Sequence, residues 1–154
     1  MKEILLVEDT DADAQLVERT LTRVGVANPI CRLRNGVEAV AYLDKAAATA
    51  AVGVPAPSIL LLDLKMPLMT GFEVLEWLQG RPEFAKMLRI VLSQIDDTRS
   101  LQRAYTLGAN SFLIKPVADA DIRSAIEAFP GYWTFRGKAG TGVRTSDQMK
   151  RRTA

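Results

Sequence analysis

Histidine is absent from the 154-residue sequence. Its absence excludes a Ser-His-Asp or Cys-His nucleophile arrangement, an imidazole metal site and a phosphohistidine within this chain. The one cysteine, Cys31, cannot form an internal disulfide, and its place in an apolar segment favours a small buried side chain over a nucleophile. Any chemistry must therefore come from carboxylates, lysines and hydroxyls.

Long apolar segments are also missing. No run approaches the roughly 18 residues that cross a bilayer, and the opening stretch MKEILLVEDT lacks the apolar core and the cleavage site of a signal peptide. Hydrophobic residues make up 48% of the chain and charged residues 25%, which is typical of one globular domain of this length. We therefore expect a cytoplasmic protein with no membrane partner.

The net charge of +2 is unevenly distributed. Residues 130–154 carry six basic side chains and one acidic one, so the rest of the chain is acidic. The basic side chains are dispersed among glycines and threonines, which favours a solvated terminus over contact with nucleic-acid phosphates or an acidic protein surface. Tyr132, Trp133 and Phe135 are expected to fold back onto the last helix or to join a dimer interface. We predict a basic C-terminal extension over 130–154, partly packed or disordered, and no nucleic-acid partner.

Hydrophobic periodicity predicts five strands that alternate with five helices. The strands are expected at 4–7, 29–36 (which ends in an Asn-Gly turn), 59–62, 87–94 and 111–116. The helices are expected before Gly25 and at 37–51, 71–79, 97–108 and 118–129. This alternation predicts an α/β fold, in which helices cover both faces of a five-stranded, doubly wound parallel sheet.

Polar side chains follow four of the predicted strands. Glu8 and Asp9 follow the first strand, Asp63 the third, Ser93 the fourth and Lys115 the fifth. All of these strand ends open at the same edge of a parallel sheet, so we expect the side chains to converge. Clustered carboxylates suit Mg²⁺, and the lysine and serine could join the metal in neutralising a phosphoryl group on an aspartate oxygen. Taken singly, these acids are also compatible with a turn cap or a helix start.

The same segments together resemble the receiver domain of two-component response regulators. The resemblance covers residues 1–129 and rests on the acid pair after the first strand, LLLDLKMP at 60–67, IVLS at 90–93 and LGANSFLIKP at 107–116. It implies a CheY-like, flavodoxin-like sheet with strand order 2-1-3-4-5. The extended connection DKAAATAAVGVPAPS is similar to that of the stand-alone response regulators associated with phytochrome-type sensor kinases.

The resemblance implies a phosphoacceptor and a metal site. Asp63 would accept the phosphoryl group. Mg²⁺ would be held by Asp9, Asp63 and the backbone carbonyl of Lys65, with Glu8 in the outer shell.

The resemblance also implies a phosphoryl-binding site and a switch. Lys115, the Ser93 hydroxyl and the backbone amide of Gln94 would bind the phosphoryl oxygens. Ser93 and Phe112 would form the switch, and Lys115–Pro116 would be a cis peptide. Gln94 stands where the family usually has a small residue, so its side chain is expected to affect the kinetics of the site.

The expected function is that of a single-domain response regulator and not of an enzyme. Its partners would be a sensor histidine kinase or a histidine phosphotransfer protein, and it could dimerise through the fourth helix, fifth strand and fifth helix. Alternatives are a degenerate receiver that binds proteins independently of phosphorylation, and an aspartate-nucleophile phosphohydrolase, although Lys65 occupies the place of that family's second aspartate. A flavin- or dinucleotide-binding domain would need a glycine-rich loop after the first strand, and acids stand there.

Overall fold

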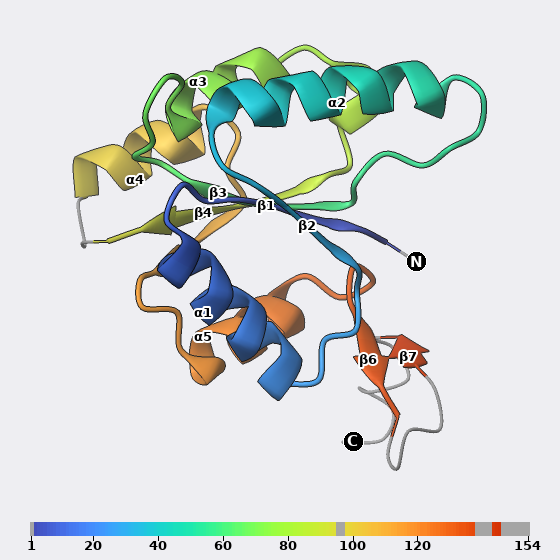
Figure 1. Cartoon of the computed structure of the whole chain (residues 1–154), viewed down its shortest axis with the longest axis vertical. Coiled ribbons are helices and arrows are strands. Elements are labelled where there is room, and N and C mark those ends of the chain that lie inside the picture. The colour runs from blue at the N-terminus through green and yellow to red at the C-terminus, as the bar shows by residue number, and fades with distance from the viewer. Residues whose placement is uncertain (1, 95–97, 138–142, 146–154) are drawn as a thin grey trace.

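A computed structural model describes residues 2–94, 98–137 and 143–145, and a parallel β-sheet runs through its centre (Figure 1). The strands are β1 (Ile4–Val7), β2 (Ile30–Leu33), β3 (Ile59–Asp63), β4 (Leu88–Ser93) and β5 (Ser111–Ile114). They lie in the order β2-β1-β3-β4-β5, and each neighbouring pair is parallel. The predicted doubly wound, flavodoxin-like fold is confirmed.

Helices cover both faces of this sheet (Figure 1). On one face lie α1 (Asp11–Arg23) and α5 (Asp119–Ala128). On the other face lie α2 (Gly36–Ala50), α3 (Gly71–Leu78) and α4 (Thr98–Thr106), and a short 3-10 helix, η1 (Pro82–Phe84), precedes β4. These helices lie where the sequence pattern predicted them, apart from small shifts at their ends.

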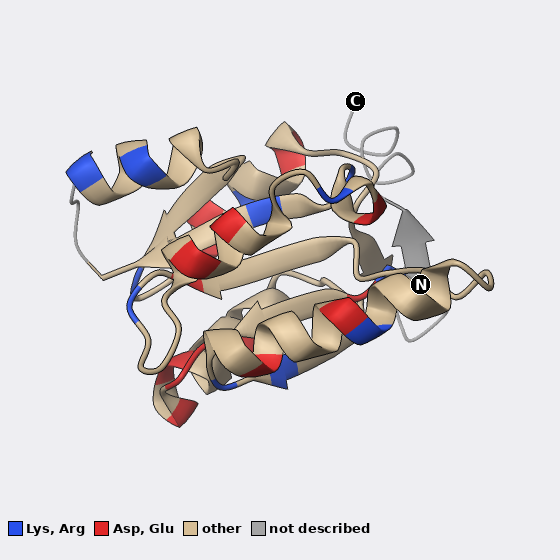
Figure 2. Ribbon diagram, turned by 90° about the horizontal axis from the view of Figure 1, so that it is seen from above, with Lys and Arg blue, Asp and Glu red and all other residues tan. Residues whose placement is uncertain are grey.

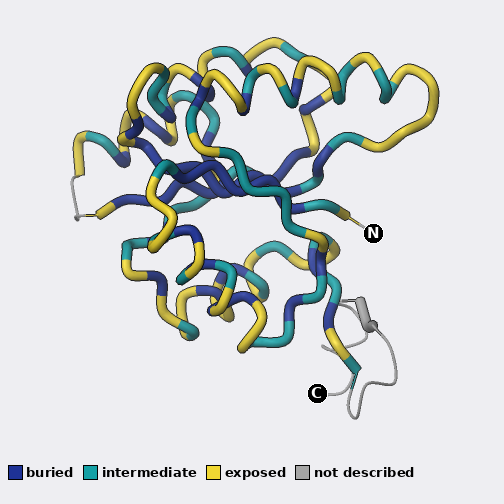
Figure 3. Tube along the Cα trace, in the orientation of Figure 1, coloured by how far each residue is buried: buried dark blue, intermediate teal, exposed yellow. Residues whose placement is uncertain are grey.

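Two hydrophobic clusters, one on each side of the sheet, form the core (Figure 3). Side chains of β3 alternate between them: Ile59 and Leu61 pack toward α1 and α5, whereas Leu60 and Leu62 pack toward the other three helices. Because both faces are covered, the central strands contain almost continuous apolar residues. Charged residues consequently lie mainly on helices and loops (Figure 2), and Asp63 is the first polar residue at the end of the apolar β3.

The edge strand β2 is less buried than the strands inside the sheet. All four of its residues are half-buried, because β2 pairs only with β1 in the sheet. Cys31, expected to be buried, is therefore half-buried. Its neighbour Arg32 has a side chain that is 17% exposed.

The chain folds back onto the sheet after α5. Trp133 and Phe135 are 1% and 3% exposed and belong to the same core cluster as α1 and α5, which confirms the expectation for these two aromatic residues. Strand β6 (Thr134–Arg136) pairs antiparallel with β7 (Val143–Thr145), a pairing that the sequence pattern did not predict. The packed structure thus continues beyond the predicted boundary at residue 129. Most of the basic extension, from residue 146 onward and at 138–142, lies outside the described residues.

Candidate functional site

The predicted site residues come together at the carboxyl ends of the strands. A cavity of about 120 Å³ opens there. Its lining includes Asp9, Asp63, Ser93 and Lys115, each from a different strand end. The parallel sheet brings these residues together because its strands all end at one edge. The full lining is Asp9, Thr10, Asp63, Leu64, Lys65, Leu92, Ser93, Gln94, Ser100 and Lys115.

The start of α3 holds the backbone after Asp63 in place. Thr70 caps this helix: its hydroxyl accepts a hydrogen bond from the Glu73 N–H, and the Glu73 carboxylate accepts one from the Thr70 N–H. Gly71 follows, and its N–H donates to the Leu64 carbonyl. A Cβ atom at Gly71 would lie 2.4 Å from the Asp63 carbonyl oxygen, so glycine is required for this close approach of helix and strand.

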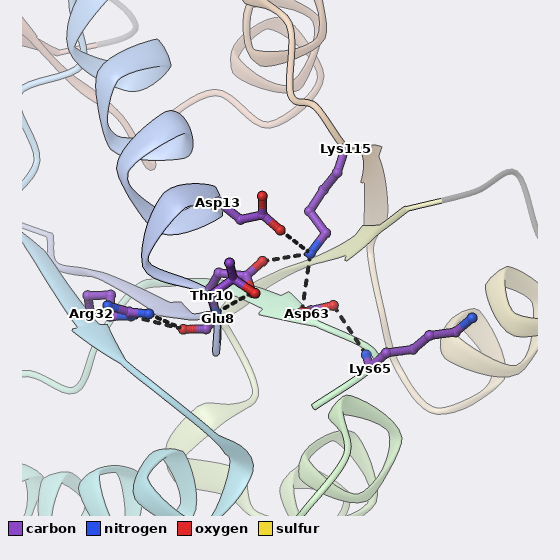
Figure 4. Close-up of polar contacts among 7 residues, drawn as sticks. All are labelled: Glu8, Thr10, Asp13, Arg32, Asp63, Lys65 and Lys115. Atoms are coloured by element: carbon purple, nitrogen blue, oxygen red, sulfur yellow. Dashed lines mark hydrogen bonds and ion pairs between the residues drawn. The ribbon is translucent and has the colours of Figure 1, made fainter. Parts of the chain in front are cut away.

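Lys115 is at the centre of the polar contacts in the site (Figure 4). Its Nζ atom lies 2.7 Å from Glu8 Oε1 and 3.2 Å from Asp63 Oδ2. A third carboxylate, Asp13 Oδ2, lies 3.2 Å away on the first turn of α1. Asp13 was not predicted to belong to the site, because an acid in a first helical turn is common without such a role. The lysine therefore connects three elements: β1, α1 and β3.

Three carboxylates are grouped closely enough to hold a metal ion. Glu8, Asp9 and Asp63 each offer an oxygen, and these oxygens lie within 4.8 Å of one another. Glu8 and Asp63 are almost fully buried, and Asp9 is half-buried beside the cavity. An all-oxygen set that remains open to water on one side fits Mg²⁺, which binds through one or two carboxylates and keeps several waters.

Burial and neighbouring charges shift the acid–base equilibria of the site. Burial raises the pKa of Glu8 to about 7, against the lowering effect of its hydrogen bonds from Lys115 and the Thr10 N–H. Burial also raises the pKa of Asp63, and the positive charge of Lys115 opposes this shift. Burial alone would lower the pKa of Lys115, but its hydrogen bond to Glu8 and the charge of Asp63 raise it. The lysine is therefore the fixed positive charge of the site.

The raised pKa of Glu8 predicts how the stability of the metal-free protein depends on pH. A carboxyl group whose folded pKa exceeds its unfolded value, here about 7 against 4.5, favours the folded state below pH 4.5 and loses this contribution as the pH rises to 7. The free energy of unfolding in EDTA should therefore fall over this range, by about 3 kcal/mol at most. Urea titrations at several pH values would measure it. Glu8→Gln should flatten the slope, and an equally steep slope in this variant would contradict the assignment.

The β4 and β5 side of the cavity contains the remaining predicted residues. Ser93 ends β4 and is 8% exposed, and the exposed Gln94 follows it at the cavity wall. The Lys115 N–H donates to the Ser93 carbonyl at 2.7 Å, and the Lys115–Pro116 peptide bond is cis. Phe112 is half-buried and does not line the cavity. Its ring meets Tyr105 of α4 edge-on, with 6.4 Å between the ring centroids.

Comparison with known proteins identifies the family. The model of the response regulator receiver domain matches residues 4–127, and the chain belongs to this family. The "Response regulator Rcp1" of Synechocystis sp. is 30% identical over 132 residues, which are 86% of this chain and 88% of Rcp1. The "Probable methanogenesis regulatory protein FilR2" of Methanothrix harundinacea is 35% identical over 130 residues, covering 84% of this chain and 82% of FilR2.

The solved structures support the same relationship. The bacteriophytochrome response regulator RtBRR superimposes with a TM-score of 0.76 at 29% identity, covering 99% of this chain and 90% of RtBRR. The predicted resemblance to receiver domains, and to the phytochrome-associated response regulators among them, is thus confirmed. In the described residues, no helix combines the length and the apolar composition that a bilayer span requires.

Proposed function

We propose that this chain is a response regulator that accepts a phosphoryl group on Asp63, with Mg²⁺, from a phosphohistidine of a partner protein. The observation that carries this proposal is the surroundings of Asp63. The Asp63 residue is 4% exposed, and its carboxylate lies near the acids Glu8 and Asp9 and 3.2 Å from the ammonium of Lys115. The partner would be a sensor histidine kinase or a histidine phosphotransfer protein, since the chain itself contains no histidine.

The transfer forms one bond and breaks another. A carboxylate oxygen of Asp63 attacks phosphorus, the P–N bond to the partner's imidazole breaks, and the electron pair leaves with the imidazole nitrogen. Ser93, Gln94 and Lys115 line the same cavity, so the Lys115 ammonium, the Ser93 hydroxyl and the Gln94 backbone amide would donate to the phosphoryl oxygens. Mg²⁺ held by Asp9, Asp63 and the Lys65 carbonyl, with Glu8 in the outer shell, would supply the positive charge that the phosphoryl oxygens need.

A switch would follow from the new charge. A phosphoryl group carries nearly two negative charges, and drawing the Ser93 hydroxyl toward it would open space for the Phe112 ring to turn inward. The Phe112 ring contacts Tyr105, so this movement would change the surface formed by α4, β5 and α5. That surface is the proposed contact for a downstream partner or for a second copy of this chain. Output through protein contacts makes the chain a signalling protein rather than an enzyme that turns over a separate substrate.

Two relatives support the assignment of metal and phosphoryl group. Rcp1 has been solved in a Mn²⁺-bound form, and the cyanobacterial phytochrome response regulator RcpA has been solved phosphorylated. In this chain, Glu8, Asp9 and Asp63 offer carboxylate oxygens that could hold such an ion. A phosphohydrolase is less well supported, because Lys65 stands where its second aspartate would act as acid and base.

The proposal is tested by intact-mass spectrometry after incubation with acetyl phosphate. The native chain should gain one phosphoryl group in the presence of Mg²⁺ and none in EDTA, because the donor and the acceptor are both negatively charged at neutral pH. Peptide mapping should place the group on Asp63. If neither acetyl phosphate nor beryllium fluoride produced an adduct, the chain would instead be a degenerate receiver that binds proteins independently of phosphorylation. Steady release of phosphate from a phosphomonoester would favour the hydrolase.

A further inference from the structure

The Arg32 side chain binds the backbone between Glu8 and Asp9. Its Nε and Nη2 atoms both donate to the carbonyl oxygen of Glu8, at 2.9 and 2.7 Å (Figure 4). The third nitrogen, Nη1, donates to Asp11 Oδ1 at 2.7 Å on the first turn of α1. The Arg32 side chain is only 17% exposed, so its two hydrogen bonds to the Glu8 carbonyl are partly shielded from water, whereas the Asp11 side chain is 61% exposed. One guanidinium thus joins β2, the end of β1 and the start of α1.

The end of the β1–β2 ladder explains why a side chain makes this contact. The Glu8 N–H still donates to the carbonyl of Leu33, the last residue of β2. The chain then turns away: Asn35 becomes the cap of α2, and its side chain accepts the Glu38 N–H. With β2 ending there, the donors on the Glu8 carbonyl come from the Arg32 guanidinium. Without these donors the buried Glu8 carbonyl would lack a hydrogen-bond partner, and the folded state would be less stable.

The held carbonyl belongs to the peptide group that links Glu8 to Asp9. Fixing its oxygen fixes the plane of this peptide and with it the directions in which both carboxylates leave the backbone. The Glu8 side chain is then held at both oxygens, by Lys115 and by the Thr10 N–H. Asp9, the proposed direct ligand of the metal, follows the same peptide group, and its carboxylate lies beside that of Glu8. The orientation of both carboxylates therefore depends on that peptide plane.

We propose that Arg32 is a positioning residue of the metal site, which aims the Glu8–Asp9 pair by holding the peptide between them. This inference rests on the proposed function, since it concerns the same Mg²⁺ site. Partners that orient the ligands of a metal ion typically change its affinity by about 10- to 100-fold when they are removed. The effect comes from geometry, because a positive charge beside the acids would by itself oppose a cation.

Arg34 provides a matched control. Its Nη1 atom donates to the same Asp11 Oδ1 at 2.7 Å, whereas the two side-chain hydrogen bonds to the Glu8 carbonyl both come from Arg32. Arg32→Met and Arg34→Met therefore remove the same charge and a contact with the same Asp11 oxygen. They differ in the hydrogen bonds to the Glu8 carbonyl and in burial, because the Arg32 side chain is 17% exposed and that of Arg34 is 59% exposed. Arg32→Lys restores the charge without the two-donor fork.

The experiment measures Mg²⁺ affinity by isothermal titration calorimetry on the full chain, with folding checked by circular dichroism. We expect Arg32→Met to weaken binding at least about tenfold, Arg34→Met to change it less than about twofold, and Arg32→Lys to leave most of the loss in place. Equal affinities in the two methionine variants would overturn the inference. Full recovery in Arg32→Lys would also overturn it, because charge alone would then be sufficient.

A second readout does not depend on metal. In ¹⁵N–¹H spectra of the metal-free protein, Arg32→Met should shift the backbone amides of Asp9 and Thr10, whereas Arg34→Met should leave them in place. Unchanged Asp9 and Thr10 amides in Arg32→Met would contradict the inference. If the native chain bound no Mg²⁺, the proposed function would fail, and these amide shifts would still decide whether Arg32 positions the turn. If Arg32→Met failed to fold, both readouts would be taken on Arg32→Lys, which keeps the positive charge but lacks the two parallel donors to the Glu8 carbonyl.

Discussion

Asp63→Asn should abolish phosphoryl uptake from acetyl phosphate under all conditions that label the native chain. The amide that replaces the carboxylate is not a nucleophile at neutral pH, and no histidine is present to take its place. The other carboxylates beside Lys115, Glu8 and Asp13, are engaged with that lysine at 2.7 and 3.2 Å. Intact-mass spectra of the variant in Mg²⁺ should show the unmodified chain alone.

Asp13→Asn is the matched control for this prediction. Asp13 contacts the same ammonium at the same 3.2 Å as Asp63, but it lies on α1 and its side chain is about one-third exposed. The Asp13→Asn variant should therefore still gain one phosphoryl group on Asp63, at a rate changed by the altered charge around Lys115. An adduct on Asp63→Asn, or the loss of labelling in Asp13→Asn with the fold intact, would move the acceptor away from Asp63.

The stability of Asp63→Asn separates a lost nucleophile from a lost fold. Burial raises the pKa of Asp63, so the charged carboxylate is disfavoured in the folded protein relative to the unfolded chain. A neutral amide of the same shape does not carry this cost. In EDTA the variant should therefore melt at a higher temperature than the native chain, as differential scanning calorimetry would show. Mg²⁺ should raise the melting temperature of the native chain more than that of the variant.

The sequence predicted the site because the site lies where each strand ends. A parallel sheet brings these ends to one edge, so five residues from distant segments could be placed together without knowing any side-chain conformation. Glu8, Asp9, Asp63, Ser93 and Lys115 could be found in this way. The directions of their side chains could not, since these depend on packing and hydrogen bonds formed only in the folded protein.

Two contacts of the site were not predictable for the same reason. Arg32 lies in an edge strand with no motif around it, and its link to Glu8 spans 24 residues of sequence. Asp13 looks like an ordinary acid at a helix start, and its link to Lys115 spans 102 residues. Arg32 lies inside its strand and Asp13 in a helical turn, so neither residue stands at a strand end, which is the position that revealed the other site residues.

The C-terminal strands were missed for a different reason. Residues after α5 contain many glycines and threonines without sustained alternation, so their sequence does not predict strands. What orders β6 is tertiary contact: Val26 and Phe135 form an antiparallel bridge, and the buried Asn28 binds the backbone just before β6 and at its first residue. Its amide donates to the Tyr132 carbonyl, and its oxygen accepts the Thr134 N–H.

This packing makes Trp133 part of the fold. Its side chain is 1% exposed, lies in the core cluster beneath the sheet, and donates from Nε1 to the Phe129 carbonyl at 3.1 Å. Trp133→Ala should therefore lower the free energy of unfolding by about 3–5 kcal/mol, through lost burial and the cavity that remains. Urea denaturation followed by circular dichroism would measure the loss.

Trp77→Ala is the control, because it removes the same side chain from a less buried position. Trp77 is half-buried, with the Arg81 guanidinium 3.8 Å from its ring centroid and Phe84 tilted against it at 6.0 Å. Because part of this ring already faces water, its removal should cost about 1–2 kcal/mol. If Trp133→Ala lowered the free energy of unfolding no more than Trp77→Ala, the segment after α5 would not contribute to the stability of the domain. If the expected difference is found, the folded unit of this receiver extends through Arg136, and variants that end the chain at residue 129 should unfold at lower urea concentration than the full chain.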